Sequence, residues 1–292
     1  MTTAPTPDAT APDVSAAGTI TIGGDLTVNR LGFGAMRITG QGIWGEPDDI
    51  DEAKAVLRRA VECGVTLIDT ADSYGPHVSE NLIREALAPY PANLVIATKG
   101  GLERPDPYKW TDNSSRSHLR DVCHTSLMRL GLEQIPLYQW HRPDPKVPLE
   151  DAIGTLMELQ KEGKIKHLGV SNVTLDQLQQ ISSMTTIVSV QNRFNMGTRG
   201  SEAIVDYCAA NGLAFIPWAP IHDFADTPAV REIAERHGAT SRQLVLAWLL
   251  ARSPAMLPIP GTGSLAHLDE NLRAASIALT EEEVSALTRA AS

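Results

Sequence analysis

The sequence predicts a single (β/α)8 barrel, an α/β fold in which eight parallel strands alternate with helices. From residue 31 onward, eight short apolar runs alternate without a break with amphipathic stretches of helical spacing. Several of these runs are apolar at consecutive positions, which is typical of parallel strands covered on both faces. The length of 292 residues suits one such barrel, and the 42% apolar content suits a sizeable core.

The eight expected strands are short, and each is followed by polar or glycine-rich residues. In chain order they are residues 31–36, 65–69, 93–99, 135–140, 166–172, 187–192, 213–218 and 256–260. A doubly wound parallel sheet is the alternative, because the order of strands in a sheet cannot be read from the sequence.

Two of the expected helices end at a glycine. In the helix expected over 50–63, the apolar residues fall on one face and Gly64 follows. The helix that begins near Leu149 has the same pattern and is followed by Gly163. Glycine tolerates the left-handed conformation in which helices often end, so both helices are expected to stop there.

Other helix boundaries are marked by threonine and glycine. Thr174 is expected to cap the helix after the fifth strand, because its hydroxyl can accept from a free backbone N–H. Residues 227–252 look like two helices broken at Gly238, with Thr240 or Ser241 as the cap of the second.

Both ends of the chain carry elements outside the barrel repeat. Residues 1–18 are rich in Thr, Ala and Pro and are expected to be a disordered tail. Residues 19–29 predict a β-hairpin that turns at Gly23-Gly24. Residues 279–291 predict a terminal helix capped by Thr280. One barrel domain is therefore expected over residues 19–292.

Charge and cysteine usage exclude several classes of protein. The net charge of −10 and the pI of about 5.3 argue against a partner that is a nucleic acid or an anionic membrane. Cys63, Cys123 and Cys208 show no metal-binding spacing and are expected to be free thiols in a reducing cytoplasm. The N-terminus lacks the features of a signal peptide, and the longest apolar run, 244–251, is too short to span a bilayer. The histidines form no metal-binding motif, so no metal is expected.

Polar residues that could take part in catalysis or binding stand at most of the expected strand ends. In a barrel these ends meet at one mouth, where active sites of this fold lie. The residues concerned are Asp69 with Tyr74 in the following loop, Lys99, His141, Ser171-Asn172, Gln191-Asn192, Trp218 and Gly261-Thr262-Gly263.

Lys99 is the hardest of these to explain as a packing residue. It directly follows the apolar run LVIAT, so its ammonium is expected near the barrel mouth, where an unpaired charge is costly. Asp69, on the preceding strand, is the natural partner. A lysine beside Tyr74 is expected to lower the pKa of the phenol, which would then serve as a proton donor or acceptor nearer neutral pH. His141 is placed to hydrogen-bond a substrate oxygen.

These residues give the sequence a resemblance to the aldo-keto reductase superfamily over residues 19–291. The motifs DTADSYG, VIATK, WHRPD and KEGKIKHLGVSN each resemble a family signature. The resemblance implies a barrel that binds a nicotinamide cofactor, a catalytic tetrad of Asp69, Tyr74, Lys99 and His141, and a monomer. It implies cofactor contacts from Gly34, Met36, Asp69, Ser171, Asn172, Gln191, Trp218, Ala219, Pro220, Ile221, Gly261, Thr262, Gly263, His267, Glu270 and Asn271.

Some of these contacts have specific implied roles. Ser171, Asn172 and Gln191 would hold the nicotinamide carboxamide. Trp218 stands where many members stack a tyrosine on the nicotinamide ring, and an indole can also stack. Glu270 and Asn271 would contact the adenine.

The segment GTGSLA (261–266) fits the pattern of a Rossmann fingerprint, but it lies too near the C-terminus for the required βαβ unit to follow. A helix that begins there would still favour an anion, and the cofactor phosphates are expected at this point. Gly261 and His267 stand where many family members carry a lysine and an arginine for the 2′-phosphate of NADP. The wider pattern still favours NADPH/NADP+, with NADH as the alternative.

The substrate pocket is expected to be aromatic. Trp44, Tyr108, Trp110 and His222 could line a pocket for flat aldehydes. The pattern GPHVSENLIREAL (75–87) and the C-terminal segment resemble bacterial pyridoxal reductases, which implies reduction of pyridoxal to pyridoxine. A broad aldehyde reductase, a natural-product ketoreductase that prefers NADH, and a non-catalytic regulatory subunit that senses the cofactor are the alternatives. A hydrolase is disfavoured, because Ser171 has no evident triad.

Overall fold

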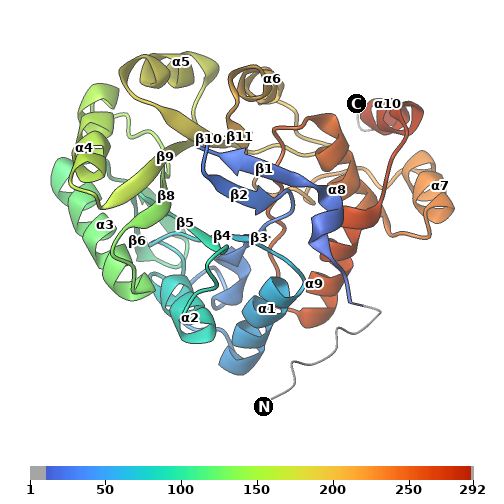
Figure 1. The fold of residues 1–292 in the computed structure, drawn as a ribbon, viewed down its shortest axis with the longest axis horizontal. Coiled ribbons are helices and arrows are strands. Elements are labelled where there is room, and N and C mark those ends of the chain that lie inside the picture. The colour runs from blue at the N-terminus through green and yellow to red at the C-terminus, as the bar shows by residue number, and fades with distance from the viewer. Residues whose placement is uncertain (1–10, 291–292) are drawn as a thin grey trace.

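The computed structural model describes residues 11–290, and they form a parallel barrel with helices around it (Figure 1). The central sheet has seven strands in the order β11-β10-β9-β8-β5-β4-β3, and all neighbours are parallel. Their bounds are β3 (Phe33–Gly34), β4 (Leu67–Asp69), β5 (Val95–Gly100), β8 (Ile135–Trp140), β9 (Ile165–Ser171), β10 (Ile187–Gln191) and β11 (Ala214–Phe215).

The eighth segment, residues 256–260, joins the two edge strands and closes the barrel. The backbone N–H of Leu257 donates to the carbonyl oxygen of Phe215 in β11 at an N···O distance of 2.9 Å. On the other side, the N–H of Gly32 donates to the carbonyl oxygen of Pro258, also at 2.9 Å. Prolines in this segment lack an N–H, so it forms an isolated bridge to β11 in place of a regular ladder. This closure confirms the barrel over the doubly wound sheet.

The helices cover the outside of the sheet (Figure 1). They are α1 (Ile50–Glu62), α2 (Val78–Leu87), α3 (Arg116–Leu130), α4 (Leu149–Lys161), α5 (Leu175–Met184), α6 (Glu202–Asn211), α7 (Pro228–Arg236), α8 (Ser241–Arg252), α9 (Leu265–Leu272) and α10 (Glu281–Ala290). The buried face of α1 includes Ala53 and Leu57, as the apolar pattern predicts. Gly64 and Gly163 follow α1 and α4 with φ angles of 88° and 75°, which confirms the predicted helix ends.

The predicted caps are present. Thr174 accepts from the N–H of Gln177 at the start of α5 and forms a capping box with it. Helices α7 and α8 are separated around Gly238, and Thr240, not Ser241, caps α8. The hydroxyl of Thr280 accepts from the N–H of Glu283 in α10 at 3.2 Å.

A hairpin plugs the end of the barrel where the strands begin. Strands β1 (Thr19–Ile22) and β2 (Leu26–Asn29) are antiparallel, and the turn between them includes Gly23 and Gly24, as predicted. Ile22 and Val28 are buried with inward-facing residues of the barrel strands, such as Leu67 and Leu137. The hairpin therefore seals this end, and the open mouth lies at the other.

The chain before the hairpin differs from the prediction. Val14–Ala17 form a short 3₁₀ helix, η1. The side chain of Val14 is buried, and the backbone N–H of Val14 donates to the carbonyl oxygen of Cys63 at 3.0 Å. The prediction of a disordered tail is therefore wrong for these residues, because an isolated valine supplies an anchor that composition alone does not reveal. Residues 1–10 of the predicted tail lie outside the described residues.

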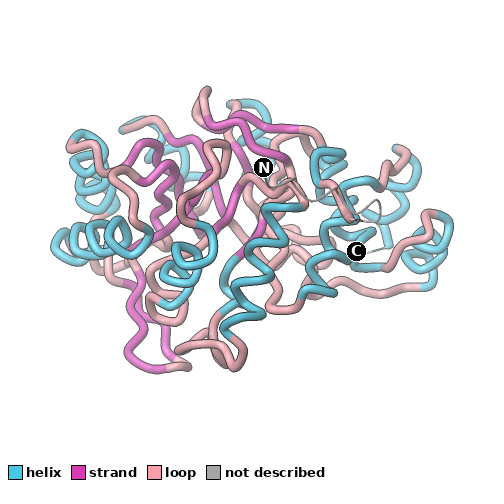
Figure 2. The backbone as a smooth tube through the Cα atoms, turned by 60° about the horizontal axis from the view of Figure 1, so that its bottom comes forward, coloured by secondary structure: helices cyan, strands magenta, loops and turns pink. Residues whose placement is uncertain are grey.

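A second hairpin, which the sequence pattern did not predict, projects beside the open mouth. It consists of β6 (Leu102–Asp106) and β7 (Lys109–Asp112), which are antiparallel. Figure 2 shows the two hairpins at opposite ends of the barrel. Two short 3₁₀ helices, η2 (Ala35–Ile38) and η3 (Arg273–Ser276), complete the fold.

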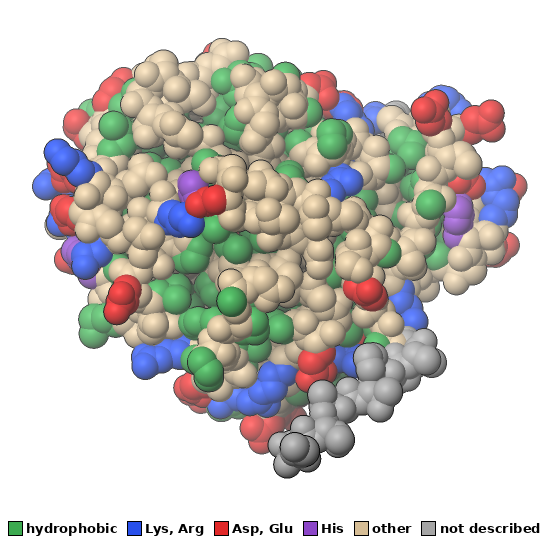
Figure 3. Space-filling model, viewed as in Figure 1, with side chains coloured by type: hydrophobic (Ala, Val, Ile, Leu, Met, Phe, Trp, Pro, Cys, Tyr) green, Lys and Arg blue, Asp and Glu red, His purple; other side chains and the backbone are tan. Residues whose placement is uncertain are grey.

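The remaining global predictions concern charge and thiols. Cys63, Cys123 and Cys208 are buried free thiols, as expected. On the face that carries the β1–β2 hairpin, charged side chains of both signs are scattered and form no large patch of a single sign (Figure 3). Within residues 11–290, no helix has the length and apolar character needed to cross a membrane, and no three potential metal ligands come together.

Candidate active site

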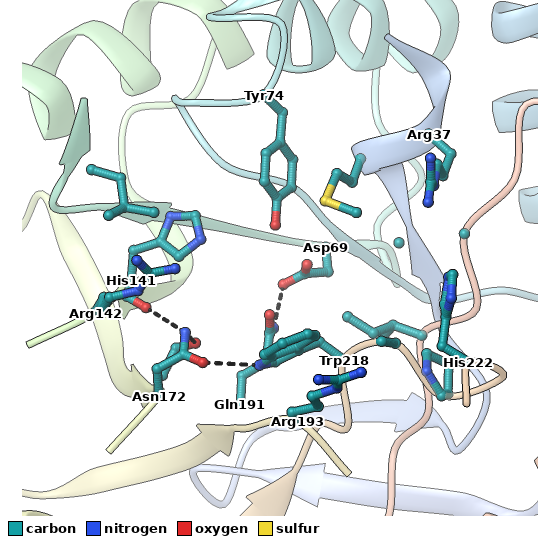
Figure 4. Close-up of a pocket in the computed structure, with 18 of the residues that line it drawn as sticks. Arg37, Asp69, Tyr74, His141, Arg142, Asn172, Gln191, Arg193, Trp218 and His222 are labelled. Atoms are coloured by element: carbon teal, nitrogen blue, oxygen red, sulfur yellow. Dashed lines mark hydrogen bonds between the residues drawn. The ribbon is translucent and has the colours of Figure 1, made fainter. Parts of the chain in front are cut away.

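A cavity of about 580 Å³ opens at the mouth of the barrel, where the strands end. Its lining combines charged, amide and aromatic side chains from most of the strand ends (Figure 4). The lining residues are Gly34, Met36, Arg37, Asp69, Tyr74, Leu102, Trp110, His141, Arg142, Ser171, Asn172, Gln191, Arg193, Trp218, Ala219, Pro220, Ile221, His222, Ile259 and Gly261.

A buried ion pair lies at the base of this cavity. The ammonium of Lys99 is 2.6 Å from Oδ2 of Asp69 and also donates to the carbonyl oxygen of Thr70 at 2.8 Å. Lys99 is 0% exposed and Asp69 is 2% exposed. Burial lowers the pKa of Lys99, but Asp69 and Tyr74 outweigh it, so the pKa lies above its usual value and the ammonium stays charged. The partnership predicted for Lys99 is confirmed.

Two amide side chains hold the other oxygen of Asp69. Oδ1 accepts from Nε2 of Gln139 at 3.0 Å and from Nε2 of Gln191 at 2.8 Å. Gln139 is fully buried in β8, and sequence analysis missed it. The signal was present, because an amide inside the apolar run IPLYQW has no obvious reason to be there unless it faces a polar group.

The phenol of Tyr74 completes this cluster, but its pKa differs from the prediction. The hydroxyl lies 3.3 Å from Nζ of Lys99, and the side chain is buried. Burial raises the pKa of Tyr74 above its usual value, even though the positive charge of Lys99 lowers it. The predicted net lowering is therefore wrong, because desolvation of the phenolate outweighs the attraction of Lys99, which the charge of Asp69 also weakens. Tyr74 is a neutral phenol at neutral pH.

His141 lies beside Tyr74 as a neutral ring. The two ring centroids are 5.9 Å apart with planes at 83°, and both side chains line the cavity. Burial, with the positive charges of Lys99 and Arg142, holds the pKa of His141 well below its usual value. Nδ1 has no hydrogen-bond partner among the described residues. A neutral imidazole with a free polar atom is suited to bind a further polar group.

The pKa of His141 predicts how folding depends on pH. A group whose folded pKa is lowered contributes stability above its unfolded pKa and loses it as pH falls. Below pH ~6.5, the free energy of unfolding is expected to fall by up to ~1.4 kcal/mol per pH unit from this residue. Urea unfolding of the cofactor-free protein at several pH values between 5 and 8 measures the slope. His141→Asn should have a shallower slope over this range, and an unchanged slope would contradict the buried neutral ring.

A second polar cluster faces the cluster of Asp69, Tyr74 and Lys99 across the cavity. The amide nitrogen of Asn172 donates to the carbonyl oxygen of His141 at 3.0 Å and to Oγ of Ser171 at 2.9 Å. Its amide oxygen accepts from the indole N–H of Trp218 at 3.0 Å (Figure 4). Asn172 has a φ angle of 58°, a left-handed conformation that asparagine tolerates better than most residues. These bonds fix the indole at the cavity wall.

The structure sorts the other predicted contacts into two groups. Those that line the cavity include Gly34, Met36, Ala219, Pro220, Ile221, Gly261, Trp110 and His222. Those that lie outside its lining are Thr262, Gly263, His267, Glu270, Asn271, Trp44 and Tyr108. The segment 262–271 continues from the cavity into α9, where Glu270 accepts from the hydroxyl of Thr240 at 2.8 Å.

Tyr108 and Trp44 therefore do not form the pocket wall that the sequence suggested. Tyr108 stands at the tip of the β6–β7 hairpin and is 91% exposed. Trp44 lies beside the guanidinium of Arg104, at 5.6 Å, and is absent from the cavity lining. For Tyr108 the reason is the hairpin, which carries it into solvent and points Trp110 inward. Trp44 instead forms a bridge with Gly75 and lies against Arg104.

Three arginines that sequence analysis overlooked also line the cavity. Arg142 pairs with Asp112 of β7 at 3.4 Å, and Arg193 pairs with Asp223. Arg37 forms no ion pair with any residue in the described range 11–290. Figure 4 shows Arg37 and His141 on opposite sides of the cavity. The position of Arg37 just past the first predicted strand was the available signal.

The start of α9 lies next to Arg37. A Cβ placed on Gly263 would lie 3.0 Å from the carbonyl oxygen of Arg37, so the two backbones approach closely. The hydroxyl of Thr262 accepts from the N–H of Ser264 at 3.1 Å, and no side chain caps the helix. Free backbone N–H groups at a helix start favour an anion.

The chain is similar to known proteins in both sequence and fold. A sequence model of the Aldo/keto reductase family matches residues 30–292. An uncharacterised oxidoreductase of Schizosaccharomyces pombe is 47% identical over 92% of this chain and 89% of its own length. Pyridoxine 4-dehydrogenase of Escherichia coli is 41% identical over 90% of this chain and 95% of its own. The crystal structure of a thermostable aldo-keto reductase with the inhibitor epalrestat superimposes with a TM-score of 0.82 at 30% identity, covering 93% of this chain and 98% of that one.

Proposed function

Because the chain belongs to the aldo/keto reductase family, we propose that it reduces aldehydes or ketones to alcohols with NADPH as the reductant. The observation that carries this proposal is the buried cluster in which Tyr74, 3.3 Å from Lys99, lies at the base of a cavity large enough for a substrate. A neutral phenol beside a fixed ammonium is suited to give a proton to a carbonyl oxygen.

The residues around the cavity fit a nicotinamide cofactor, which supplies the hydride when bound. Ser171, Asn172 and Gln191 place hydroxyl and amide groups on one side, where they can bind a carboxamide. Trp218 offers a flat indole held by its bond to Asn172. The start of α9 and Arg37 offer positive charge for phosphate groups.

The residues of the chain then have separate roles. Tyr74 donates its phenolic proton to the substrate oxygen, and Lys99 stabilises the phenolate that this leaves. Asp69 holds Lys99 in place, and the amides of Gln139 and Gln191 fix Asp69. His141, as a neutral ring, donates a hydrogen bond that orients the carbonyl next to Tyr74. Apolar walls at Trp110 and Trp218 exclude water from the reacting atoms.

Arg37 is the best-placed cation for the 2′-phosphate of NADPH, since Gly261 and His267 do not supply the usual basic pair. Arg37→Gln is expected to raise KM for NADPH about tenfold, because a charge-assisted contact to phosphate is lost. KM for NADH should change much less in the same variant. An equal rise for both cofactors would assign Arg37 to the shared pyrophosphate, and no rise for either would exclude it from the cofactor site.

The substrate that we propose first is pyridoxal, with pyridoxine as the product. The similarity to pyridoxine 4-dehydrogenase of Escherichia coli supports it, as do the aromatic walls of the cavity. A broad preference for aldehydes is the alternative. Steady-state loss of reduced-nicotinamide absorbance, measured with pyridoxal, benzaldehyde and each of NADPH and NADH, tests both. Turnover of benzaldehyde but not pyridoxal would rule out pyridoxal as the substrate. Turnover of no carbonyl compound with either cofactor would overturn the proposed function.

A further inference from the structure

Arg104 of β6 is a buried guanidinium that binds backbone carbonyl groups. It is 8% exposed, and no carboxylate forms an ion pair with it in the part of the chain that the structure describes. Nη1 donates to the carbonyl oxygen of Ile43 at 3.0 Å, and Nη2 donates to those of Gly42 at 3.0 Å and Pro107 at 2.8 Å. Arg104 therefore ties the loop around residue 43 to the tip of its own hairpin.

The same guanidinium stacks on an aromatic wall of the cavity. Its central carbon lies 3.7 Å from the ring centroid of Trp110, a close cation–π contact. Trp110 in turn lies edge to face with Tyr74, with ring centroids 6.4 Å apart and planes at 77°. Trp110 and Tyr74 both line the cavity, and Arg104 does not. Arg104 thus supports the indole from outside the cavity.

The turn that carries Tyr74 is part of this arrangement. Trp44 forms a bridge with Gly75, next to Tyr74, and the ring of Trp44 lies 5.6 Å from the guanidinium of Arg104. Nη1 of Arg104 also reaches the carbonyl oxygen of Ser73, on the other side of Tyr74, at 3.5 Å. One side chain therefore contacts the loop near residue 43, the hairpin and the turn of Tyr74.

The hairpin needs such a tether. A two-stranded hairpin alone is marginally stable in water, and the tip residue Tyr108 is almost fully exposed. Two ion pairs connect the hairpin to its surroundings, Asp112 with Arg142 at 3.4 Å and Glu103 with His118 at 3.7 Å. Both include partly exposed groups, so they contribute little. Arg104 is the side chain that contacts both Trp110 and the turn that carries Tyr74.

We propose that Arg104 is a specificity-determining residue that positions Trp110 as a rigid wall beside Tyr74, and that this wall selects planar aromatic aldehydes over small aliphatic ones. The inference rests on the proposed reductase function. A fixed indole offers a flat surface on which an aromatic ring can stack, whereas a small aliphatic aldehyde gains little from it. Lysine could not replace Arg104, because the planar fork both stacks and donates to several carbonyl groups.

The test compares 2-naphthaldehyde with propanal, with NADPH saturating. Arg104→Met keeps a long unbranched stem but removes the guanidinium. In this variant, kcat/KM for 2-naphthaldehyde should fall about tenfold more than kcat/KM for propanal. The loss should lie mainly in KM, because Tyr74, Lys99 and Asp69 are unchanged. Arg104→Lys, which keeps the charge, should show most of the same loss.

Trp110→Ala and the double variant show whether Arg104 acts through Trp110. In the Trp110→Ala background, Arg104→Met should change the ratio of the two kcat/KM values little further, because the indole that Arg104 positions is already absent. An equal additional change would overturn the proposal. So would a Trp110→Ala variant with the preference of the wild type, a result that does not require the Arg104 variants to fold. A wild type that reduces neither aldehyde contradicts the proposed function itself, whereas one that reduces both without preference contradicts only this inference.

Discussion

Replacing Tyr74 with phenylalanine is expected to lower kcat for aldehyde reduction by about 10³-fold, within the range for loss of a positioned proton donor. The substitution removes one hydroxyl, 3.3 Å from Lys99, and leaves the aromatic ring that packs against Trp110 and His141. The Kd for NADPH, measured by quenching of protein fluorescence, should stay within about twofold of the wild-type value. The hydroxyl that is removed acts on the substrate in the transition state and is not needed to bind the cofactor.

The chain offers a matched control for this substitution. Tyr138 in β8 is also fully buried, and its hydroxyl has no hydrogen-bond partner within the described residues. Tyr138→Phe therefore removes a buried phenolic oxygen outside the cavity, and kcat should stay within about twofold of wild type. Near-native kcat in Tyr74→Phe, or an equal loss in both variants, would show that Tyr74 is not the proton donor.

Replacing Lys99 with methionine is expected to lower the free energy of unfolding by about 3–5 kcal/mol and to abolish turnover. Methionine fills a similar volume but leaves the carboxylate of Asp69 buried without its cation, and the amides of Gln139 and Gln191 compensate only in part. Urea unfolding at neutral pH gives the free energy, and the aldehyde assay gives the turnover.

Two further variants separate the buried pair from lysine substitutions in general. Lys54→Met breaks an ion pair with Glu85, whose carboxylate is largely exposed, and should cost no more than about 1 kcal/mol. Adding Asp69→Asn to Lys99→Met removes the stranded charge and should recover part of the lost stability. If Lys99→Met costs no more than Lys54→Met, the buried pair does not have the energetic role assigned to it.

The barrel and the centre of its site could be predicted from the sequence because each signal was local. A lysine directly after an apolar strand demands a partner, and the strand before it ends in Asp69, so the ion pair followed from spacing and fold class alone. The closing segment 256–260 was also predictable, although its prolines limit it to single bridges.

What the sequence could not show depends on three-dimensional surroundings. The neighbours of Tyr74 were identified, but the direction of its pKa shift depends on how completely water is excluded, which has no local signal. The β6–β7 hairpin is an insertion after one strand and follows no barrel repeat. It separates Tyr108 from Trp110, two residues apart in sequence, into an exposed tip and a wall of the cavity.

The central claim is that a hydride passes to a carbonyl carbon in this cavity while Tyr74 supplies the proton. The most direct test is a single-turnover reaction of the wild-type protein with an aromatic aldehyde and NADPH in which both hydrogens at C4 of the nicotinamide are deuterium. Mass spectrometry of the alcohol is expected to show one deuterium per molecule at the former carbonyl carbon, and Tyr74→Phe should give almost no product under the same conditions. Alcohol without the label, or no alcohol from the wild type, would contradict the claim.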